Sequence, residues 1–341
     1  MNQVRQTDIA ERLGISPQAV GFALSTRADL RRKVAENTRR KVVRTAQQMG
    51  YVPHRAAQAL ARGKTDTFII LVPDQLHHPH IHELLQALQH TVRPHGYKLM
   101  FEMIDPADDL TDTLQGFSRA NCDGVILMTW APEWPPASLT KWRKRVPLVI
   151  AGPCDSKAVF WATYDRRRAA ELATGHLLDR GHRHVLLVFD VRDNPVSQQR
   201  VQGYRAAHAA RGVAVDERLL LRSPVETNVT ELADRILQSK PQPTALFCYN
   251  DELTLRLLQT LHRRGIRVPQ DMALVALPNS RLTTLDEVPL TAMDTNHPGV
   301  ARAVIDMLLE QVRDPKARPR HALVEPHLVV RESSGPPRRP R

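Results

Sequence analysis

The sequence predicts an α/β protein in which a small helical module precedes two doubly wound α/β lobes. Three observations lead to this prediction. Short segments with helix-capping residues fill the first 50 residues, and strands alternate with helices from residue 66 onward. The total of 341 residues suits two or three domains. Alternating strands and helices form parallel sheets with right-handed crossovers. About 270 residues is large for one such sheet, so we expect two similar lobes.

The first 50 residues predict three short helices with a small core of their own. The segment TDIAERLG begins with Thr7 as the expected N-cap and ends at Gly14, which suits a left-handed C-cap. SPQAVGFALS begins with Ser16 as N-cap and Pro17 at the first helical position. AENTRRKVVRTAQQMG carries apolar residues at helical spacing up to Gly50. Two helices joined by a tight turn and packed on a third give helix-turn-helix geometry.

The next segment, residues 53–64, predicts a linker. HRAAQALAR has high helix propensity but is too short to be a stable helix alone in water. We therefore expect a hinge that folds only in contact with a partner, between a head of residues 1–52 and a larger body.

The body, residues 65–330, predicts two rounds of strand and helix. We expect the first lobe over 65–163 plus 292–325 and the second over 164–291. Ligands in such folds bind at the carboxyl ends of the strands, here in the cleft between the lobes. The expected strands span 67–74, 97–104, 123–130, 147–152, 184–190, 218–222, 244–251 and 272–277, and the expected helices 80–96, 109–120, 138–145, 166–181, 198–212, 228–238 and 252–265. Residues 331–341, rich in Pro and Arg, predict a disordered basic tail.

The positive charge is concentrated in the head. The formal net charge is +12, and residues 1–64 hold 13 Lys and Arg against four Asp and Glu, which gives +9. Residues 65–335 carry 32 bases and 32 acids. A positive module on a neutral body favours a polyanionic partner for the module, although a solvated charged face would give the same composition.

Several classes of protein lack support in the sequence. No segment has the apolar length of a membrane span or secretory signal, so we expect a cytoplasmic protein. The spacing of the three cysteines suits neither a zinc site nor a disulfide framework. The four histidines of HHPHIH have no partner at a signature spacing, so we expect no metal and no cofactor. No G-x-S-x-G, P-loop, H-E-x-x-H or G-x-G-x-x-G motif is present, and we expect no enzyme.

The order of motifs resembles the LacI/GalR family of bacterial transcriptional regulators over nearly the whole chain. The resemblance runs through TDIAERLGISPQAVGFALS, RRKVVRTAQQMGYVPHRAAQALARGKT, CDGVILM, HLLDRGHRHVLLV, RVQGYRAA, CYNDELTLRLLQTLHRRGIRVPQDMALVAL and HLVVRESSGPP. It implies a body like type I periplasmic binding proteins. It also implies a homodimer that binds a palindromic double-stranded DNA operator and responds to a small effector. The tail has no leucine heptads, which favours a dimer over a tetramer.

The resemblance implies a set of DNA-binding residues. Pro17, Gln18 and Gly21 would face the bases, where a Gln can pair with adenine through two hydrogen bonds. The family usually has Ser-Arg at Gly21-Phe22, so Phe22 either packs on the third helix, which we favour, or meets a thymine methyl. The backbone contacts would come from Arg5, Thr7, Ser16 and Tyr51, with Arg27, Arg31, Arg32 and Lys33 of a long basic loop compensating for the missing Arg. In the hinge, His54, Ala57 and Leu60 would bind DNA, with Leu60 wedged into the minor groove.

The resemblance also implies an effector pocket. Its residues would be Asp74, His80, Ile81, Trp130, Arg200, Asn250, Asp251 and Asn279. Arg200 has the fork geometry to hold a sugar hydroxyl or a carboxylate. The acid that usually grips sugar hydroxyls is replaced by Pro278, followed by Asn279, which makes a simple hexose less certain and leaves a degenerate effector response open.

The resulting expectation is a sequence-specific repressor controlled by a sugar or sugar derivative of a carbohydrate-utilisation operon. Two alternatives stay open at this point. One is a corepressor-type regulator that senses a nucleobase or another metabolite. The other is a plain solute-binding protein, which the basic head and the absence of an export signal disfavour.

Overall fold

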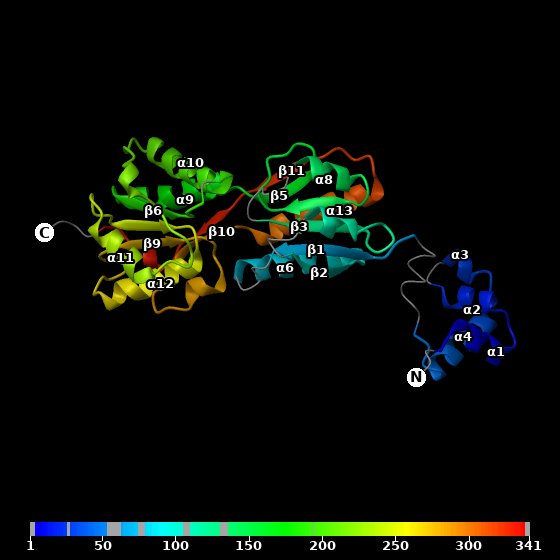
Figure 1. Cartoon of the computed structure of the whole chain (residues 1–341). Helices are drawn as coiled ribbons and strands as arrows, with labels where there is room; N and C mark the ends of the chain where they lie inside the picture. The colour runs from blue at the N-terminus through cyan, green and yellow to red at the C-terminus, as the bar shows by residue number, and fades with distance from the viewer. Residues whose placement is uncertain are drawn as a thin grey trace. The chain divides into compact units, whose positions relative to one another are not determined.

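The structure is a computed structural model that describes residues 4–25, 28–52, 63–73, 79–104, 110–129, 136–192 and 194–337. The chain forms two compact units, Met1–Gly63 and Lys64–Arg341, which we call the head and the body (Figure 1). The predicted fold class is confirmed, with a helical head and two α/β lobes in the body. Among the described residues, no helix has the length and apolarity needed to cross a membrane.

The head has four helices around one small core. They are α1 (Gln6–Leu13), α2 (Pro17–Leu24), α3 (Ala28–Arg31) and α4 (Glu36–Gln48). The buried core residues come from α1, α2 and α4, namely Ile9, Ala10, Val20, Ala23, Val42 and Ala46. Their spacing places one apolar stripe of each helix against the others, which is what stabilises such short helices.

The caps of the head are partly as predicted. Gly14 is a left-handed C-cap, and Ser16 caps α2 with Pro17 in its first turn. The prediction that Thr7 caps α1 is wrong. Arg5 occupies the N-cap position, and its backbone N–H donates to the Asp8 carboxylate at 2.8 Å. The short helix α3 within the basic loop was not predicted from the sequence.

The first lobe of the body is a parallel sheet in the order β11-β5-β4-β3-β1-β2. One face packs against α6 (Pro79–Val92) and α13 (His297–Arg313), and the other against α7 (Leu110–Gln115) and α8 (Pro136–Arg143). Its strands are β1 (Thr67–Pro73), β2 (Lys98–Ile104), β3 (Gly124–Met128), β4 (Leu148–Ala151), β5 (Phe160–Tyr164) and β11 (His321–Val324).

The second lobe repeats this plan in the order β12-β10-β9-β8-β6-β7, with β12 antiparallel to β10. Helices α11 (Val229–Gln238) and α12 (Asp251–Arg263) cover one face, and α9 (Arg166–Asp179) and α10 (Pro195–Ala209) the other. Its strands are β6 (Val185–Phe189), β7 (Leu220–Arg222), β8 (Ala245–Cys248), β9 (Ala273–Ala276), β10 (Thr291–Asp294) and β12 (His327–Val329).

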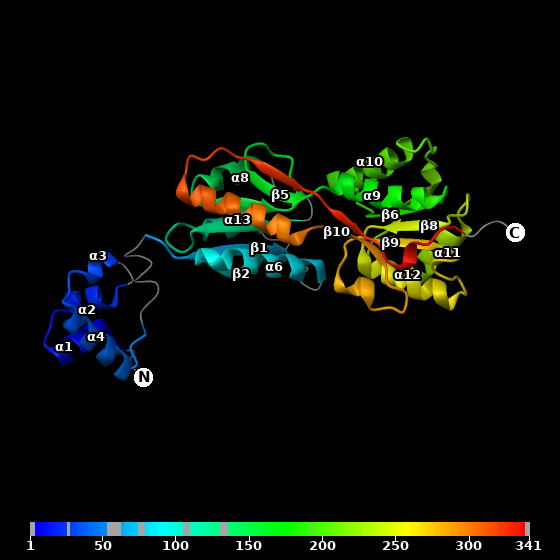
Figure 2. The same cartoon turned by 180° about the vertical axis from the view of Figure 1, so that it is seen from behind.

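The chain passes between the lobes after β5, after β10 and after β11, as the green, orange and red segments show in Figures 1 and 2. The segment 292–325 was expected in the first lobe. Its helix α13 and strand β11 do lie there, but β10 pairs in the second sheet. Strand β5 was not predicted at all.

Residues 331–337 do not belong to a disordered tail, contrary to the prediction. The buried Ser333 donates from Oγ to the Leu274 carbonyl at 2.7 Å and accepts from the Thr291 backbone N–H at 2.8 Å. The His182 ring nitrogen lies 2.9 Å from the Gly335 carbonyl oxygen. These bonds satisfy buried polar groups of the second lobe, which is why the segment is held in place.

Candidate DNA-binding and effector-binding sites

Helix α2 presents its first residues to solvent. The Ser16 hydroxyl accepts from the Ala19 backbone N–H at 3.1 Å, which starts the helix and leaves Pro17 and Gln18 exposed. Val20 on the opposite side is fully buried in the head. The amide of Gln18 is therefore free to meet a base edge in the major groove.

Gly21 lies where α2 approaches α1. A Cβ at this position would come 3.2 Å from Gln6 Oε1, and Gln6 Nε2 donates to the Tyr51 hydroxyl at 3.0 Å. The missing side chain therefore leaves room for a contact between α1 and Tyr51, in the segment that follows α4. This contact accounts for Gly at position 21, where the LacI/GalR family that the sequence resembles usually has Ser.

Phe22 is half-buried on α2, and the Lys33 ammonium lies 5.3 Å from the centroid of its ring. This is a cation–π contact. Arg5 and Thr7 are exposed on the head, and Arg31 is half-buried on α3. Four predicted DNA-binding residues, Arg27, His54, Ala57 and Leu60, lie outside the described residues.

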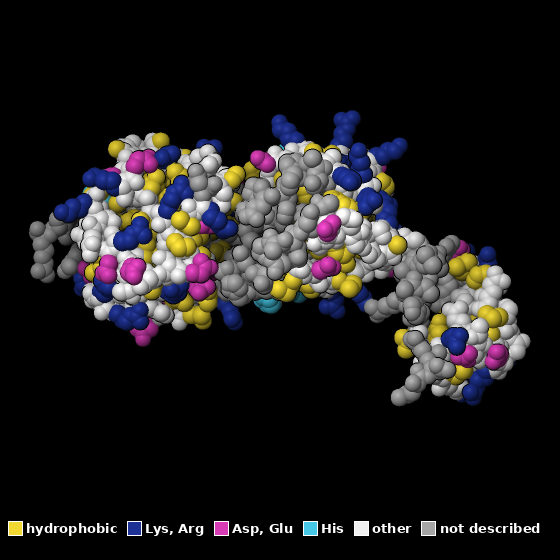
Figure 3. All heavy atoms as spheres, viewed as in Figure 1, with side chains coloured by type: hydrophobic (Ala, Val, Ile, Leu, Met, Phe, Trp, Pro, Cys, Tyr) yellow, Lys and Arg dark blue, Asp and Glu magenta, His cyan; other side chains and the backbone are white. Residues whose placement is uncertain are grey.

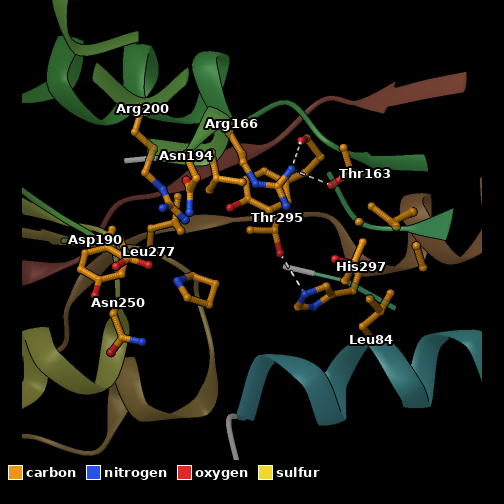
Figure 4. Close-up of a pocket in the computed structure, with 18 of the residues that line it drawn as sticks. Leu84, Thr163, Arg166, Asp190, Asn194, Arg200, Asn250, Leu277, Thr295 and His297 are labelled. Carbon is orange, nitrogen blue, oxygen red and sulfur yellow. Dashed lines mark hydrogen bonds between the residues drawn. The ribbon is translucent and has the colours of Figure 1, made fainter. Parts of the chain in front are cut away.

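The body contains a cavity of about 170 Å³ at the carboxyl ends of the strands of both lobes (Figure 4). Helices begin at its wall. Asn194 and Asn250 cap α10 and α12 by accepting backbone N–H bonds at 2.9 and 2.8 Å, and Arg166 and His297 are the first residues of α9 and α13. Such an edge is the expected ligand site of an open α/β sheet.

Arg166 is only 7% exposed at the cavity wall. Its Nη1 donates to Thr163 Oγ1 at 2.8 Å and to the Tyr164 carbonyl at 3.4 Å, and its guanidinium lies 4.4 Å from the centroid of the Tyr164 ring. Burial lowers the pKa of this guanidinium, and the nearby Arg200 also lowers it. A buried cation held near another cation favours a negative ligand.

Arg200 projects from α10 into the same cavity, as Figure 4 shows. It is 8% exposed and its guanidinium lies 5.3 Å from the centroid of the Tyr249 ring. Within the described part of the chain, its buried Nε has no hydrogen-bond partner. A buried donor without a partner is costly, so this atom is a candidate for a ligand contact.

Asp190 is the acidic residue of the cavity wall. Its carboxylate accepts from Arg192 Nε and Nη2 at 3.1 and 2.8 Å. Burial raises the pKa of Asp190, but the hydrogen bonds from Arg192 outweigh this, and the net pKa is lowered. Asp190 is therefore ionised at neutral pH, with Arg192 as its partner.

The predicted effector residues divide into three groups. Arg200 and Asn250 line the cavity, together with Pro278. Ile81, Asp251 and Asn279 do not, because each has another contact. Ile81 is in the core of the first lobe, the Asp251 carboxylate accepts from the Ser280 hydroxyl, and Asn279 Oδ1 accepts from Arg331 Nη2 at 2.7 Å. Asp74 and Trp130 lie outside the described residues, as does the side chain of His80.

Sequence reasoning missed several residues of the cavity wall. Arg166, Asn194, Thr163, Thr295 and His297 all line it. Arg166 is the first residue of a predicted helix, and Asn194 lies shortly before another, but the helix α13 that begins with His297 was not predicted. Thr163 belongs to the strand that was not predicted.

Comparisons with known proteins agree with this architecture. Residues 174–334 match the periplasmic binding protein-like domain family. The chain is 26% identical to the HTH-type transcriptional repressor PurR of Aliivibrio fischeri strain MJ11 over 334 residues, which covers 96% of this chain and 97% of that protein.

Two solved structures share the fold. The Lac repressor dimer bound to operator and the anti-inducer ONPF superposes with a TM-score of 0.82 at 17% identity, covering 98% of this chain and all of that one. The complex of the transcriptional regulator CelR with cellobiose superposes with a TM-score of 0.69 at 24% identity, covering 97% and 100%.

Proposed function

Because the chain belongs to the LacI/GalR family of transcriptional repressors, which are not enzymes, we propose that it represses transcription in the cytoplasm by binding a palindromic operator as a homodimer. The effector proposed for the body is a sugar or sugar derivative. DNA binding and effector binding are properties of the family, and the operator, the dimer and the effector class are our proposals.

The observation that carries the DNA-binding part is the exposed start of α2. Ser16 and Pro17 begin the helix, Gln18 faces solvent and the apolar side of the helix is buried in the head. In this proposal the head comprises residues 1–52, and the hinge 53–64 folds on the minor groove with Leu60 as its wedge.

The dimer is supported by strand β2 at the edge of the first sheet. Met100, Phe101 and Met103 are 57%, 53% and 53% exposed. Neighbouring residues of a strand point to opposite faces, so both faces of this strand carry uncovered apolar side chains. Large uncovered apolar side chains at a sheet edge are typical of an interface, and a second copy of this chain is the occupant that a palindromic operator requires.

The sugar is supported by the cavity wall and by a structural neighbour. Thr163, Thr295, Asn194 and Asn250 offer neutral polar groups around the cavity, which suit ligand hydroxyls. The CelR structure of the same fold was solved with cellobiose.

In-vitro selection from random duplexes at about 150 mM salt, with full-length protein, tests the proposal. The expected product is a palindrome. Gln18→Ala should weaken binding to it about 10-fold or more and relax the preference at one A·T pair in each half-site. Gln48→Ala, at an exposed position near the end of α4, is the matched control and should bind as the parent does. A selection that yields no consensus contradicts the proposed function.

The effector class is tested separately by titrating the protein–operator complex with neutral and acidic sugars and with purine and pyrimidine bases. A change in operator affinity on addition of a sugar supports the proposal. A response to nucleobases alone contradicts it and favours a corepressor-type regulator.

A further inference from the structure

Among the described residues, the wall of the cavity in the body holds more positive than negative charge. It includes Arg166, Arg192 and Arg200, against one carboxylate, that of Asp190. Arg192 occupies that carboxylate through two side-chain hydrogen bonds. Arg166 and Arg200 are both more than nine-tenths buried. Within the part of the chain that the structure describes, neither guanidinium has a hydrogen bond to a carboxylate, and both face the cavity.

Their hydrogen-bonding capacity is also incompletely used. Both described hydrogen bonds of Arg166 run from Nη1, and both go to neutral oxygens. The Nε of Arg200 is buried without a partner. A guanidinium has five N–H donors in a planar fork, so each of these residues retains donors for a ligand. Figure 4 shows both side chains at the wall of one cavity, Arg200 from α10 and Arg166 from the start of α9.

The helix backbones also contribute positive electrostatic potential at the cavity. Helices α9, α10, α12 and α13 all begin at the wall, through Arg166, Asn194, Asn250 and His297. The N-terminus of a helix carries a partial positive charge. The helix starts alone would suit any acceptor, but together with two buried arginines they make the cavity a place where a negative group is strongly favoured.

We propose that the effector carries an oxyanion, a carboxylate or a phosphate, which binds Arg166 and Arg200. The neutral polar groups of the wall then hold the hydroxyls of the same molecule, so the effector is an acidic or phosphorylated sugar rather than a neutral one. This inference rests on the proposed effector site of the body, and it deepens that proposal by giving the ligand its charge.

Thermal unfolding of the full-length protein with inorganic phosphate tests the anion site directly. The melting temperature Tm is compared in sodium phosphate and in sodium chloride at equal ionic strength. Phosphate should raise the Tm of the parent by about 3 °C or more, because a ligand that binds only the folded state stabilises it. Arg166→Gln and Arg200→Gln should each lose most of this gain.

Arg168→Gln is the matched control on the same helix. Arg168 is more exposed and pairs with Glu171 and Glu325, away from the cavity wall, so this variant should keep the full gain. Equal Tm values of the parent in the two salts would overturn the proposal. A gain retained by Arg166→Gln and Arg200→Gln would overturn it too, since phosphate would then act elsewhere, for example on the basic head.

Acetate in the same assay distinguishes the two sources of the oxyanion. A larger arginine-dependent gain with phosphate assigns a phosphorylated sugar, and a larger gain with acetate assigns a sugar acid. Operator affinity without ligand is measured for the parent and for the control Arg168→Gln, and the two should be equal. If the parent binds the operator but shows no response to anions, only the proposal of a charged effector is refuted. If the parent shows no preference for the operator, the proposed function itself is refuted.

Discussion

At the scale of single residues, Phe22 and Lys33 show how the head departs from the pattern it resembles. An Arg that could donate hydrogen bonds to DNA is replaced by an aromatic ring, and the Lys33 ammonium lies over that ring. The ring holds a cation beside α2. In the proposed complex with DNA, Lys33 would supply charge where the missing Arg would have stood, and its contribution should not depend on the DNA sequence.

Lys33→Gln should weaken binding to the selected operator and to scrambled DNA by the same factor. The slope of log affinity against log salt should fall by about 1 per head, because one phosphate contact is lost. Fluorescence anisotropy at several salt concentrations measures both quantities. Lys141→Gln, on α8 of the body, is the control for charge alone. A loss confined to the operator would show that Lys33 reads sequence instead.

At the scale of secondary-structure elements, helices α9 and α10 approach each other closely at Gly203. A Cβ on Gly203 would come 2.0 Å from the Arg167 carbonyl oxygen and 2.9 Å from the Ala170 Cβ. Both neighbours are fixed parts of α9, so neither can move aside. The Gly in RVQGY is thus required by packing, and the cavity residues on the two helices depend on this approach.

Gly203→Ala should lower the free energy of unfolding by roughly 2–4 kcal/mol through overpacking. Gly116→Ala is the matched control, because its Cβ would make only an ordinary contact with the Thr113 carbonyl at 3.5 Å. Urea denaturation followed by circular dichroism compares the two. A Gly203→Ala protein as stable as the parent would mean that α9 and α10 lie farther apart.

The C-terminal segment 331–337 is held to α9 by a titratable group. Burial, together with the Arg180 guanidinium, lowers the pKa of His176 to about 4. Its Nε2 accepts from Arg180 Nε at 3.0 Å and lies 2.8 Å from the Ser334 hydroxyl. A proton on Nε2 would remove the acceptor that Arg180 uses and would place a second cation beside the Arg180 guanidinium, so the neutral ring is the form that suits this arrangement.

The parent should therefore lose stability between about pH 6.5 and pH 4. Above pH 6.5 the ring is neutral in both states, and below it the unfolded chain takes up a proton that the folded chain rejects. The loss from this group is about 1–2 kcal/mol after allowing for its partial exposure. His176→Gln should show a shallower pH dependence in thermal melts. His90→Gln, at an exposed position of α6, should follow the parent, and identical curves for all three proteins would contradict this role of His176.

The elements that the sequence predicted are those with a strong local signal. Local sequence patterns were sufficient to predict the N-cap at Ser16, the left-handed C-cap at Gly14 and the buried strands β1, β3, β6 and β8. Strand β5 and the position of β10 were not predictable in this way. They are defined by pairing with strands far away in the sequence, and FWATY and TAMD have no distinctive periodicity.

The residues of the cavity also differ in how far the sequence could predict them. Arg200 and Asn250 were predicted because they belong to the motifs RVQGYRAA and CYNDEL, which resemble the family. Arg166 is one of three consecutive arginines at the start of a helix, and nothing in the sequence distinguishes it from the other two. Only the fold shows that the first of the three is buried. The contact between Asn279 and Arg331 joins residues 52 positions apart, so no local pattern could show that the Asn279 side chain is turned away from the pocket.

At the scale of the whole molecule, the excess positive charge lies mainly in the head, whereas the exposed apolar edge strand β2 belongs to the body. Basic and acidic side chains are interspersed over the visible face of the body (Figure 3), in line with the 32 bases and 32 acids of residues 65–335, whereas residues 1–64 carry +9 of the net charge of +12. A stretch of the body without net charge neither attracts nor repels DNA at long range. Its edge strand β2 is then free to form the proposed contact with a second copy.

Phe101→Glu should convert dimers to monomers and weaken operator binding at least 10-fold, because a single head loses the second half-site. Sedimentation velocity and anisotropy on the same samples measure the two effects. Leu323→Glu is the matched control, since Leu323 is 57% exposed on β11 at the opposite edge of the same sheet. A Phe101→Glu protein that sediments as the parent does would place the proposed interface elsewhere.

The repeated passage of the chain between the lobes also has a consequence for biosynthesis. Helix α13 packs on the first sheet and β11 completes its edge, although both leave the ribosome after nearly all of the second lobe. The lobe that is translated first is thus completed only after most of the second lobe has been translated. While synthesis continues, the face of β3, β4 and β5 that α13 will cover stays open, so a nascent chain stalled before residue 297 should need chaperone protection at that face.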